Sequence, residues 1–122
     1  MPGPDRKEKP ANLLEFTPVH LARWEQDAQG IIVLLIPKFT NAFLAKHVMP
    51  RMKRPNFRIK LDEFGTWVWL HIDGRRTVYQ IGVELQQEFG DKVEPVFQRL
   101  GLFINSLAQH RYISLHHDKV KA

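Results

Sequence analysis

The first half of the chain contains short apolar runs bounded by turn residues, a pattern typical of strands. Residues 31–36 are all aliphatic and rich in β-branched side chains, and Pro37 ends a run that is too short for a helix. Residues 23–27, followed by a turn that ends at Gly30, predict a second strand. The two strands are expected to pair as an antiparallel hairpin.

A less regular segment separates this hairpin from a third predicted strand. Residues 39–56 begin with helical spacing of apolar side chains, but Pro50 and Pro55 prevent a long helix, so we expect a two-turn helix and a basic loop. Residues 57–61 then alternate apolar and basic side chains, the period of a half-buried strand. In this strand we expect Phe57, Ile59 and Leu61 to face inward and Arg58 and Lys60 to face outward.

Three helices are predicted after the third strand, because the apolar period changes there. The first is capped by Asp62 and ends at Gly74. The second begins with a capping box at residues 77–80 and ends at Gly90, and the third opens at Pro95. The third helix carries a wide apolar stripe formed by Val96, Phe97, Leu100, Phe103, Ile104 and Leu107.

The order of elements predicts an α+β domain of winged-helix type, in which an N-terminal β-hairpin and a third strand precede a three-helix unit. Residues 112–115 are expected to add a short last strand. We expect one domain over residues 13–118, with a basic insertion at 38–56. Residues 1–12 are proline-rich and charged, which predicts a flexible tail, and residues 119–122 form a second tail.

Composition narrows the class of protein. The chain has 122 residues, of which 43% are hydrophobic and 25% charged, and it contains no cysteine. Disulfides, cysteine-zinc sites and iron-sulfur clusters held by this polypeptide are therefore excluded. No apolar run approaches the roughly 20 residues that span a bilayer, and the first ten residues have no apolar signal core. We therefore expect a cytoplasmic protein that has no contact with a membrane.

The net charge of +5 is concentrated in one segment. Residues 38–60 hold seven lysine and arginine residues and no acidic residue, whereas the segments before and after each sum to one negative charge. The basic segment could bind nucleic acid, an acidic peptide or an enzyme surface, or it could be a solvated face. The second predicted helix has no basic residue, and the third offers only Arg99 and Arg111, which makes DNA reading by a recognition helix a weak hypothesis.

Residues that could perform chemistry are few. His110, His116, His117 and Asp118 lack the spacing of a zinc-binding helix, so we expect no metal. The chain has no nucleophile motif and no glycine loop for phosphate, and we expect neither a cofactor nor catalytic residues. Trp67 and Trp69 are two residues apart and cannot share one helical face, so one of them is an interface anchor or packs beneath another segment.

One segment resembles a known protein family. The junction between the first two predicted helices, Ile72-Asp73-Gly74-Arg75-Arg76-Thr77-Val78 followed by Ile81, is similar to a motif of the PqqD family. The resemblance covers roughly residues 57–115, with a looser similarity at 22–36. The motif has a physical reason, because Gly74 permits a left-handed turn that ends one helix and Thr77 caps the next.

This resemblance implies a winged-helix peptide-recognition module. In the family, the leader of a precursor peptide adds as a strand to a sheet edge beside the third helix, and a radical S-adenosylmethionine enzyme then modifies the peptide, as in pyrroloquinoline quinone synthesis. Carried onto this chain, the edge is Phe57, Arg58, Ile59, Lys60 and Leu61. Arg58 and Lys60 would favour acidic leader residues. The third helix would contribute Leu102 as an apolar contact, together with Gln98, Asn105 and Gln109.

The insertion at 38–56 departs from the family pattern, in which a short turn joins the second and third strands. It could cover the expected edge or enlarge the binding surface, and the sequence leaves both open. Two other functions also stay open. One is a winged-helix protein that binds nucleic acid through the insertion, and the other is a pure protein-protein interaction domain, monomeric or homodimeric.

Overall fold

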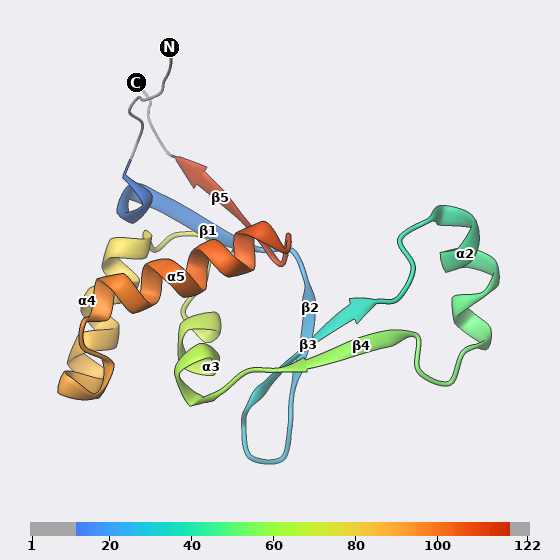
Figure 1. The fold of residues 1–122 in the computed structure, drawn as a ribbon, viewed down its shortest axis with the longest axis horizontal. Helices are drawn as coiled ribbons and strands as arrows, with labels where there is room; N and C mark the ends of the chain where they lie inside the picture. Colours follow the sequence, from blue (N-terminus) through green and yellow to red (C-terminus); the bar gives the residue numbers. More distant parts are fainter. Residues whose placement is uncertain (1–11, 118–122) are drawn as a thin grey trace, which may run out of the picture. The chain divides into compact units, whose positions relative to one another are not determined.

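The computed structural model describes residues 12–117 (Figure 1). Contacts divide the chain into two compact units. One unit comprises residues 22–69, and the other comprises residues up to 21 together with those from 70 onward. Each unit has its own sheet and its own helices, and each is described by itself.

The unit of residues 22–69 is built on a three-stranded antiparallel sheet. Its strands are β2 (Arg23–Gln26), β3 (Ile32–Pro37) and β4 (Asn56–Lys60), in the spatial order β2-β3-β4. The segment between β3 and β4 contains the short helix α2 (Ala42–His47) and the 3-10 turn η2 (Met49–Arg51). Helix α3 (Glu63–Leu70) follows β4.

Helix α3 attaches to the start of β3. The Thr66 hydroxyl accepts a hydrogen bond from the Ile32 N–H at 3.0 Å, and both residues are buried. The indole of Trp69 is fully buried and makes an edge-on contact with Trp24 of β2, with ring centroids 5.6 Å apart. Asp62 caps the helix, because its carboxylate accepts the Gly65 N–H at 2.7 Å. The apolar run of β3 therefore supplies the core of this unit.

The other unit pairs the two ends of the described chain. Strand β1 (Phe16–His20) follows the 3-10 turn η1 (Leu13–Glu15) and is antiparallel to β5 (Ile113–His117). Helices α4 (Val78–Phe89) and α5 (Val96–Gln109) pack on each other and are joined by η3 (Gly90–Val93). The fully buried side chains of Ile81, Leu85, Leu100 and Ile104 form the core between these helices.

The turn before α4 is fixed by a group of polar contacts. Gly74 adopts a φ of 78°, and the Asp73 carboxylate accepts the N–H groups of Arg75 and Arg76, each at 2.9 Å. The Arg76 guanidinium pairs with Asp73 at 2.7 Å and with Glu84 of α4 at 2.8 Å. Thr77 then begins α4 with a complete capping box. These contacts fix the conformation of the turn that leads into α4.

The predicted α+β class is confirmed, with strands at the start of the chain and helices after them. The hairpin, the third strand, the short helix in the insertion, the capping box and the last strand all lie where the sequence predicts them. Three details were wrong. Helix α3 ends at Leu70 instead of Gly74, Pro95 is the N-cap of α5 instead of its first residue, and β1 was not predicted.

The predicted tails fall mostly outside the described residues. Of residues 1–12, only Asn12 is described, and its side chain caps η1 by accepting the Leu14 N–H. Residues 119–122 are also outside. No helix in residues 12–117 has the length and apolar character needed to cross a membrane.

Candidate functional site

Strand β4 forms one edge of the three-stranded sheet, and its outer side has no strand partner among residues 12–117. Two hydrogen bonds fix which backbone groups point outward. The Leu61 N–H donates to the Ile32 carbonyl and the Lys38 N–H to the Pro55 carbonyl, both at 2.9 Å. Because the hydrogen-bonding direction alternates along an antiparallel strand, residues 57 and 59 also face β3. The N–H and C=O groups of Asn56, Arg58 and Lys60 therefore point away from the sheet.

The side chains of Arg58 and Lys60 share one face of this sheet with two acidic partners. Arg58 pairs with Glu25 of β2 at 2.6 Å, and Lys60 lies 3.7 Å from Asp27. The Ile31 N–H is the largest cause of the lowered pKa of Asp27, and the Gln29 N–H and Lys60 lower it further. Arg58, Glu25 and Lys60 are exposed to solvent and Asp27 is half-buried, so each pair contributes little to stability. The two cations thus face outward as predicted, with acidic partners that the sequence analysis did not name.

The opposite face of β4 is less buried than its apolar side chains suggested. Ile59 and Leu61 are half-buried, but 56% of Phe57 is exposed, so the burial predicted for Phe57 was wrong although it shares a face with Ile59. Phe57 lies opposite Ile36 of β3. Helix α3 attaches at Ile32, four residues earlier on the same strand, so about 13 Å of strand separates Ile36 from the attachment point. The Lys38 ammonium lies 5.5 Å from the centre of the Phe57 ring. Phe57 is therefore available for contact with a partner.

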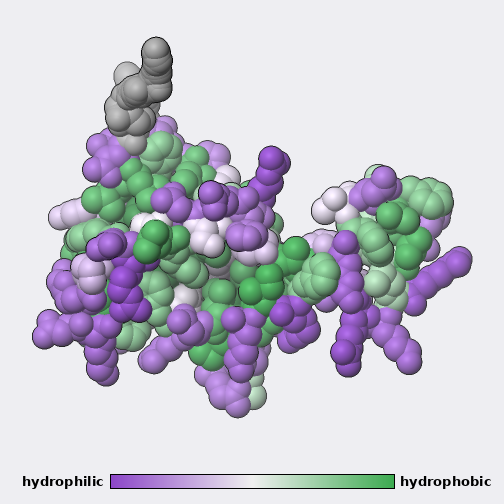
Figure 2. Space-filling view, viewed as in Figure 1, coloured by the Kyte–Doolittle hydropathy of each residue, from purple (hydrophilic) through white to green (hydrophobic). Residues whose placement is uncertain are grey.

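The insertion extends beyond the ends of β3 and β4 and does not pair with the outer edge of β4 (Figure 1). Asn41 caps α2 by accepting the N–H groups of Phe43 and Leu44. Figure 2 shows apolar surface on the insertion, with hydrophilic side chains projecting around it. The sequence left open whether the insertion covers the edge of β4 or enlarges the binding surface. This arrangement agrees better with an enlarged surface.

The four candidate residues of the third helix lie on the exposed side of α5. Gln98, Leu102, Asn105 and Gln109 are all exposed, and Leu102 has 68% of its surface accessible. Helix α5 belongs to the unit that does not contain β4. The structure thus groups the nine predicted site residues into two surfaces, five on or next to β4 and four on α5. A groove shared by both surfaces stays a prediction.

The histidines near the end of the chain have local partners. His117 lies 3.2 Å from the Glu15 carboxylate and His116 lies 2.8 Å from the Ser114 hydroxyl, while Asp118 is outside the described residues. No cluster of three metal-ligating side chains occurs within residues 12–117. Of the two tryptophans on α3, Trp69 is fully buried and Trp67 is half-buried.

Sequence reasoning missed the outward backbone groups of β4 and the acidic partners of its cations. Both follow from the register between strands, which pairs Arg58 with Leu35 and Lys60 with Val33. Once the hairpin register is known, Glu25 falls opposite Val33 on the same face as Lys60. The alternation of side chains was readable from the sequence, but the register was not.

Comparison with known proteins gives one match. Residues 47–113, more than half of the chain, match the family model "PqqD: Coenzyme PQQ synthesis protein D (PqqD)". The matched segment runs from the end of α2 through β4, α3, α4 and α5 to the first residue of β5, and it leaves β2 and β3 outside. Neither the curated proteins nor the solved structures gave a match.

Proposed function

The chain belongs to the PqqD family, whose members serve coenzyme PQQ synthesis, and we propose that it binds a precursor peptide by accepting it as an added strand along β4. The observation that carries the proposal is the outer edge of β4, where the backbone groups of Asn56, Arg58 and Lys60 have no strand partner in residues 12–117. A peptide in extended conformation can satisfy these groups with its own backbone. The role is non-catalytic.

Backbone pairing supplies affinity, and the side chains of β4 supply preference. A peptide strand beside β4 places alternate side chains on the two faces of the sheet. On one face they meet Arg58 and Lys60, which favours acidic residues, although such residues must compete with Glu25 and Asp27. On the other face they meet the exposed ring of Phe57. The peptide preferred by this edge therefore alternates acidic and apolar residues.

The bound peptide is presented to a radical S-adenosylmethionine enzyme, as the family resemblance implies. This chain contains no cysteine, so the thiolates that hold an iron-sulfur cluster must come from the partner enzyme. The contribution of this chain is to hold the leader in an extended form while the partner acts on the rest of the peptide.

The outward direction of the Arg58 N–H makes the proposal testable with proline. Arg58→Pro removes one outward donor and places a ring in the path of an added strand, whereas the bond pattern to β3 needs no N–H from this residue. Arg58→Ala removes the same side chain and keeps the donor. With a synthetic precursor peptide of the coenzyme PQQ pathway, titration calorimetry should give at least about tenfold weaker binding for Arg58→Pro than for Arg58→Ala.

A second pair of proline and alanine variants keeps the test decisive if circular dichroism shows that Arg58→Pro does not fold. Lys60→Pro and Lys60→Ala differ in the same way at the next outward position. Equal affinity of the proline and alanine variants, in a folded protein, would show that the peptide does not pair with the edge of β4. Ile59→Pro is unsuitable, because the Ile59 N–H faces β3.

A further inference from the structure

Two neighbouring hollows lie where the insertion joins the sheet. The first has a volume of about 280 Å³ and is lined by Leu35, Lys53, Arg54, Pro55, Asn56 and Arg58. The second has a volume of about 260 Å³ and is lined by Arg23, Pro37, Ala45, Met49, Pro50, Pro55 and Asn56. They share Pro55 and Asn56, so the two hollows adjoin. We call these lining residues together the root surface.

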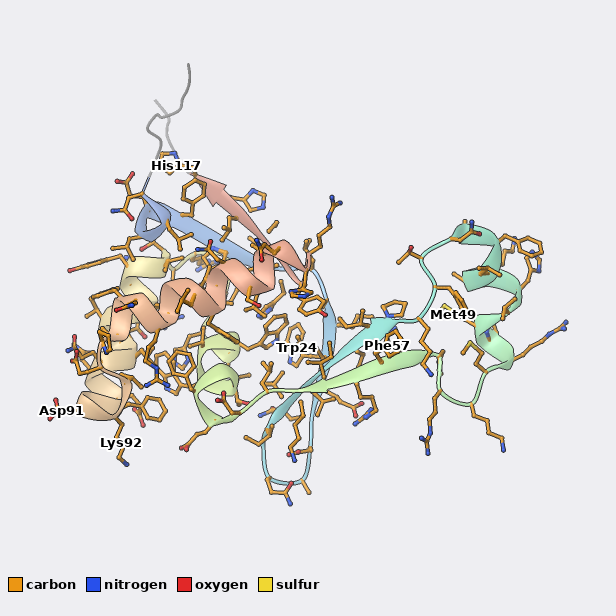
Figure 3. All side chains as sticks on the ribbon, in the orientation of Figure 1. Trp24, Met49, Phe57, Asp91, Lys92 and His117 are labelled. Atoms are coloured by element: carbon orange, nitrogen blue, oxygen red, sulfur yellow. The ribbon has the colours of Figure 1, made fainter. Side chains whose placement is uncertain are left out.

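The strand register places both hollows on the same face of the sheet. Arg23, Leu35 and Arg58 are direct cross-strand neighbours, and Pro37 is the neighbour of Asn56. Because residues two apart on a strand share a face, all five belong to one face. Met49, labelled in Figure 3, comes from the insertion and lines the second hollow. All residues of the root surface lie within the unit of residues 22–69.

The charges of the root surface all have one sign. Four of its residues are cationic, namely Arg23, Lys53, Arg54 and Arg58, and none is acidic. Arg58 is paired with Glu25. Within residues 12–117, no carboxylate pairs with Arg23, Lys53 or Arg54. The surface is therefore complementary to a ligand with several negative charges.

The floor of the hollows distinguishes between anionic ligands. Six of the lining residues are apolar, three of them prolines, and no aromatic ring lines either hollow. Single-stranded nucleic acid is usually held by aromatic rings on which bases stack, and phosphate groups gain nothing from an apolar floor. An aliphatic side chain gains from burial there. A polypeptide that carries an aliphatic residue between carboxylates satisfies both the floor and the rim.

We propose that the root surface is a second docking site, which binds an acidic segment of a partner protein by burying an aliphatic side chain in a hollow and pairing the flanking carboxylates with Lys53 and Arg54. This site shares Asn56 and Arg58 with the edge of β4, but it uses side chains of the insertion and does not depend on strand addition. Most of its insertion residues, Lys53 and Arg54 among them, lie within the segment matched by the family model.

A defined probe tests this site. The acetylated, fluorescently labelled peptide Glu-Glu-Leu-Glu-Glu is titrated with the full chain at low salt, and anisotropy is measured. We expect saturable binding, at least about tenfold weaker for a peptide with serine in place of leucine, and no binding when glutamine replaces every glutamate. Lys53→Glu/Arg54→Glu should weaken the binding of the leucine peptide at least about tenfold.

The insertion offers a matched control for the charge change. Lys46→Glu/Arg51→Glu reverses the same number of charges on exposed residues that line neither hollow. This variant should weaken binding by less than about threefold. Equal losses of affinity in the two double variants would show that the peptide is held only by non-specific charge attraction. Equal affinity of the serine and leucine peptides, absence of saturable binding to the wild-type chain, or tighter binding of a single-stranded DNA oligonucleotide would overturn the proposal.

Discussion

Replacing Gly82 with alanine should destabilise the unit that contains α4 and α5. A β-carbon at this position would lie 2.3 Å from Cε1 of Phe97, 2.8 Å from Cδ1 and 3.1 Å from Cζ. Carbon atoms in contact are normally about 3.5 Å apart or more, so the ring must move by more than about 1 Å. The Phe97 ring is stacked on Tyr79, with centroids 5.6 Å apart and planes 3° apart, and that contact would be disturbed.

The expected magnitude is a difference between two opposing effects. Overpacking of this severity costs about 2–3 kcal/mol, and alanine gains about 1 kcal/mol over glycine in the interior of a helix. We therefore expect Gly82→Ala to lower the free energy of unfolding by about 1–2 kcal/mol. In a Phe97→Ala background the obstacle is gone, and the same substitution should raise the free energy of unfolding by up to about 1 kcal/mol.

Urea unfolding of the wild-type chain, the two single variants and the double variant measures both effects. Far-UV circular dichroism reports on the helices, and tryptophan fluorescence reports separately on the unit of residues 22–69, because all three tryptophans lie there. If Gly82→Ala stabilises the wild-type chain, or if the sign of its effect is the same with and without the Phe97 ring, the close approach of α4 and α5 at this point is wrong.

Two further predictions concern the turn before α4 and the exposed face of α5. The N–H groups of Arg76 and Arg75 hold the pKa of Asp73 below its usual value of 3.8. The charged carboxylate therefore stabilises the fold above about pH 4. This contribution is lost as the pH falls through the lower pKa of the folded state. The difference in urea midpoint between the wild-type chain and Asp73→Asn should therefore shrink in acid, and a difference independent of pH would contradict this. Leu102→Ser should change the free energy of unfolding by less than about 0.5 kcal/mol, because Leu102 is exposed. If α5 contributes a contact to the peptide, the same substitution should weaken precursor-peptide binding about fivefold or more. Unchanged affinity would show that α5 is not part of the site.

Helix ends were predictable from sequence wherever a local signal defines them. The capping box of Thr77 and Gln80 and the stop at Gly90 depend only on residues within a few positions. The end of α3 was predicted four residues too late, because Ile72 continues the apolar spacing of Phe64 and Val68. Ile72 is indeed buried, but from the turn that follows the helix.

Features that depend on distant partners were not predictable. Strand β1 contains Pro18, which argues against a strand in the interior of a sheet, but β1 is an edge strand paired with β5 nearly a hundred residues away. Phe57 has the alternation of a core residue and is exposed, because the helix that covers this face attaches at the other end of β3. The hollows of the root surface combine residues from β2, β3, β4 and the insertion, and only the register brings these together.

The most direct test of strand addition is amide hydrogen exchange measured by NMR with and without saturating synthetic precursor peptide. In the free protein, the inward amides of Phe57 and Ile59 should exchange slowly, and the outward amides of Asn56, Arg58 and Lys60 should exchange fast. Addition of the peptide as a strand predicts that the three outward amides become protected. Saturating peptide that leaves all three exchanging as fast as before would contradict the account.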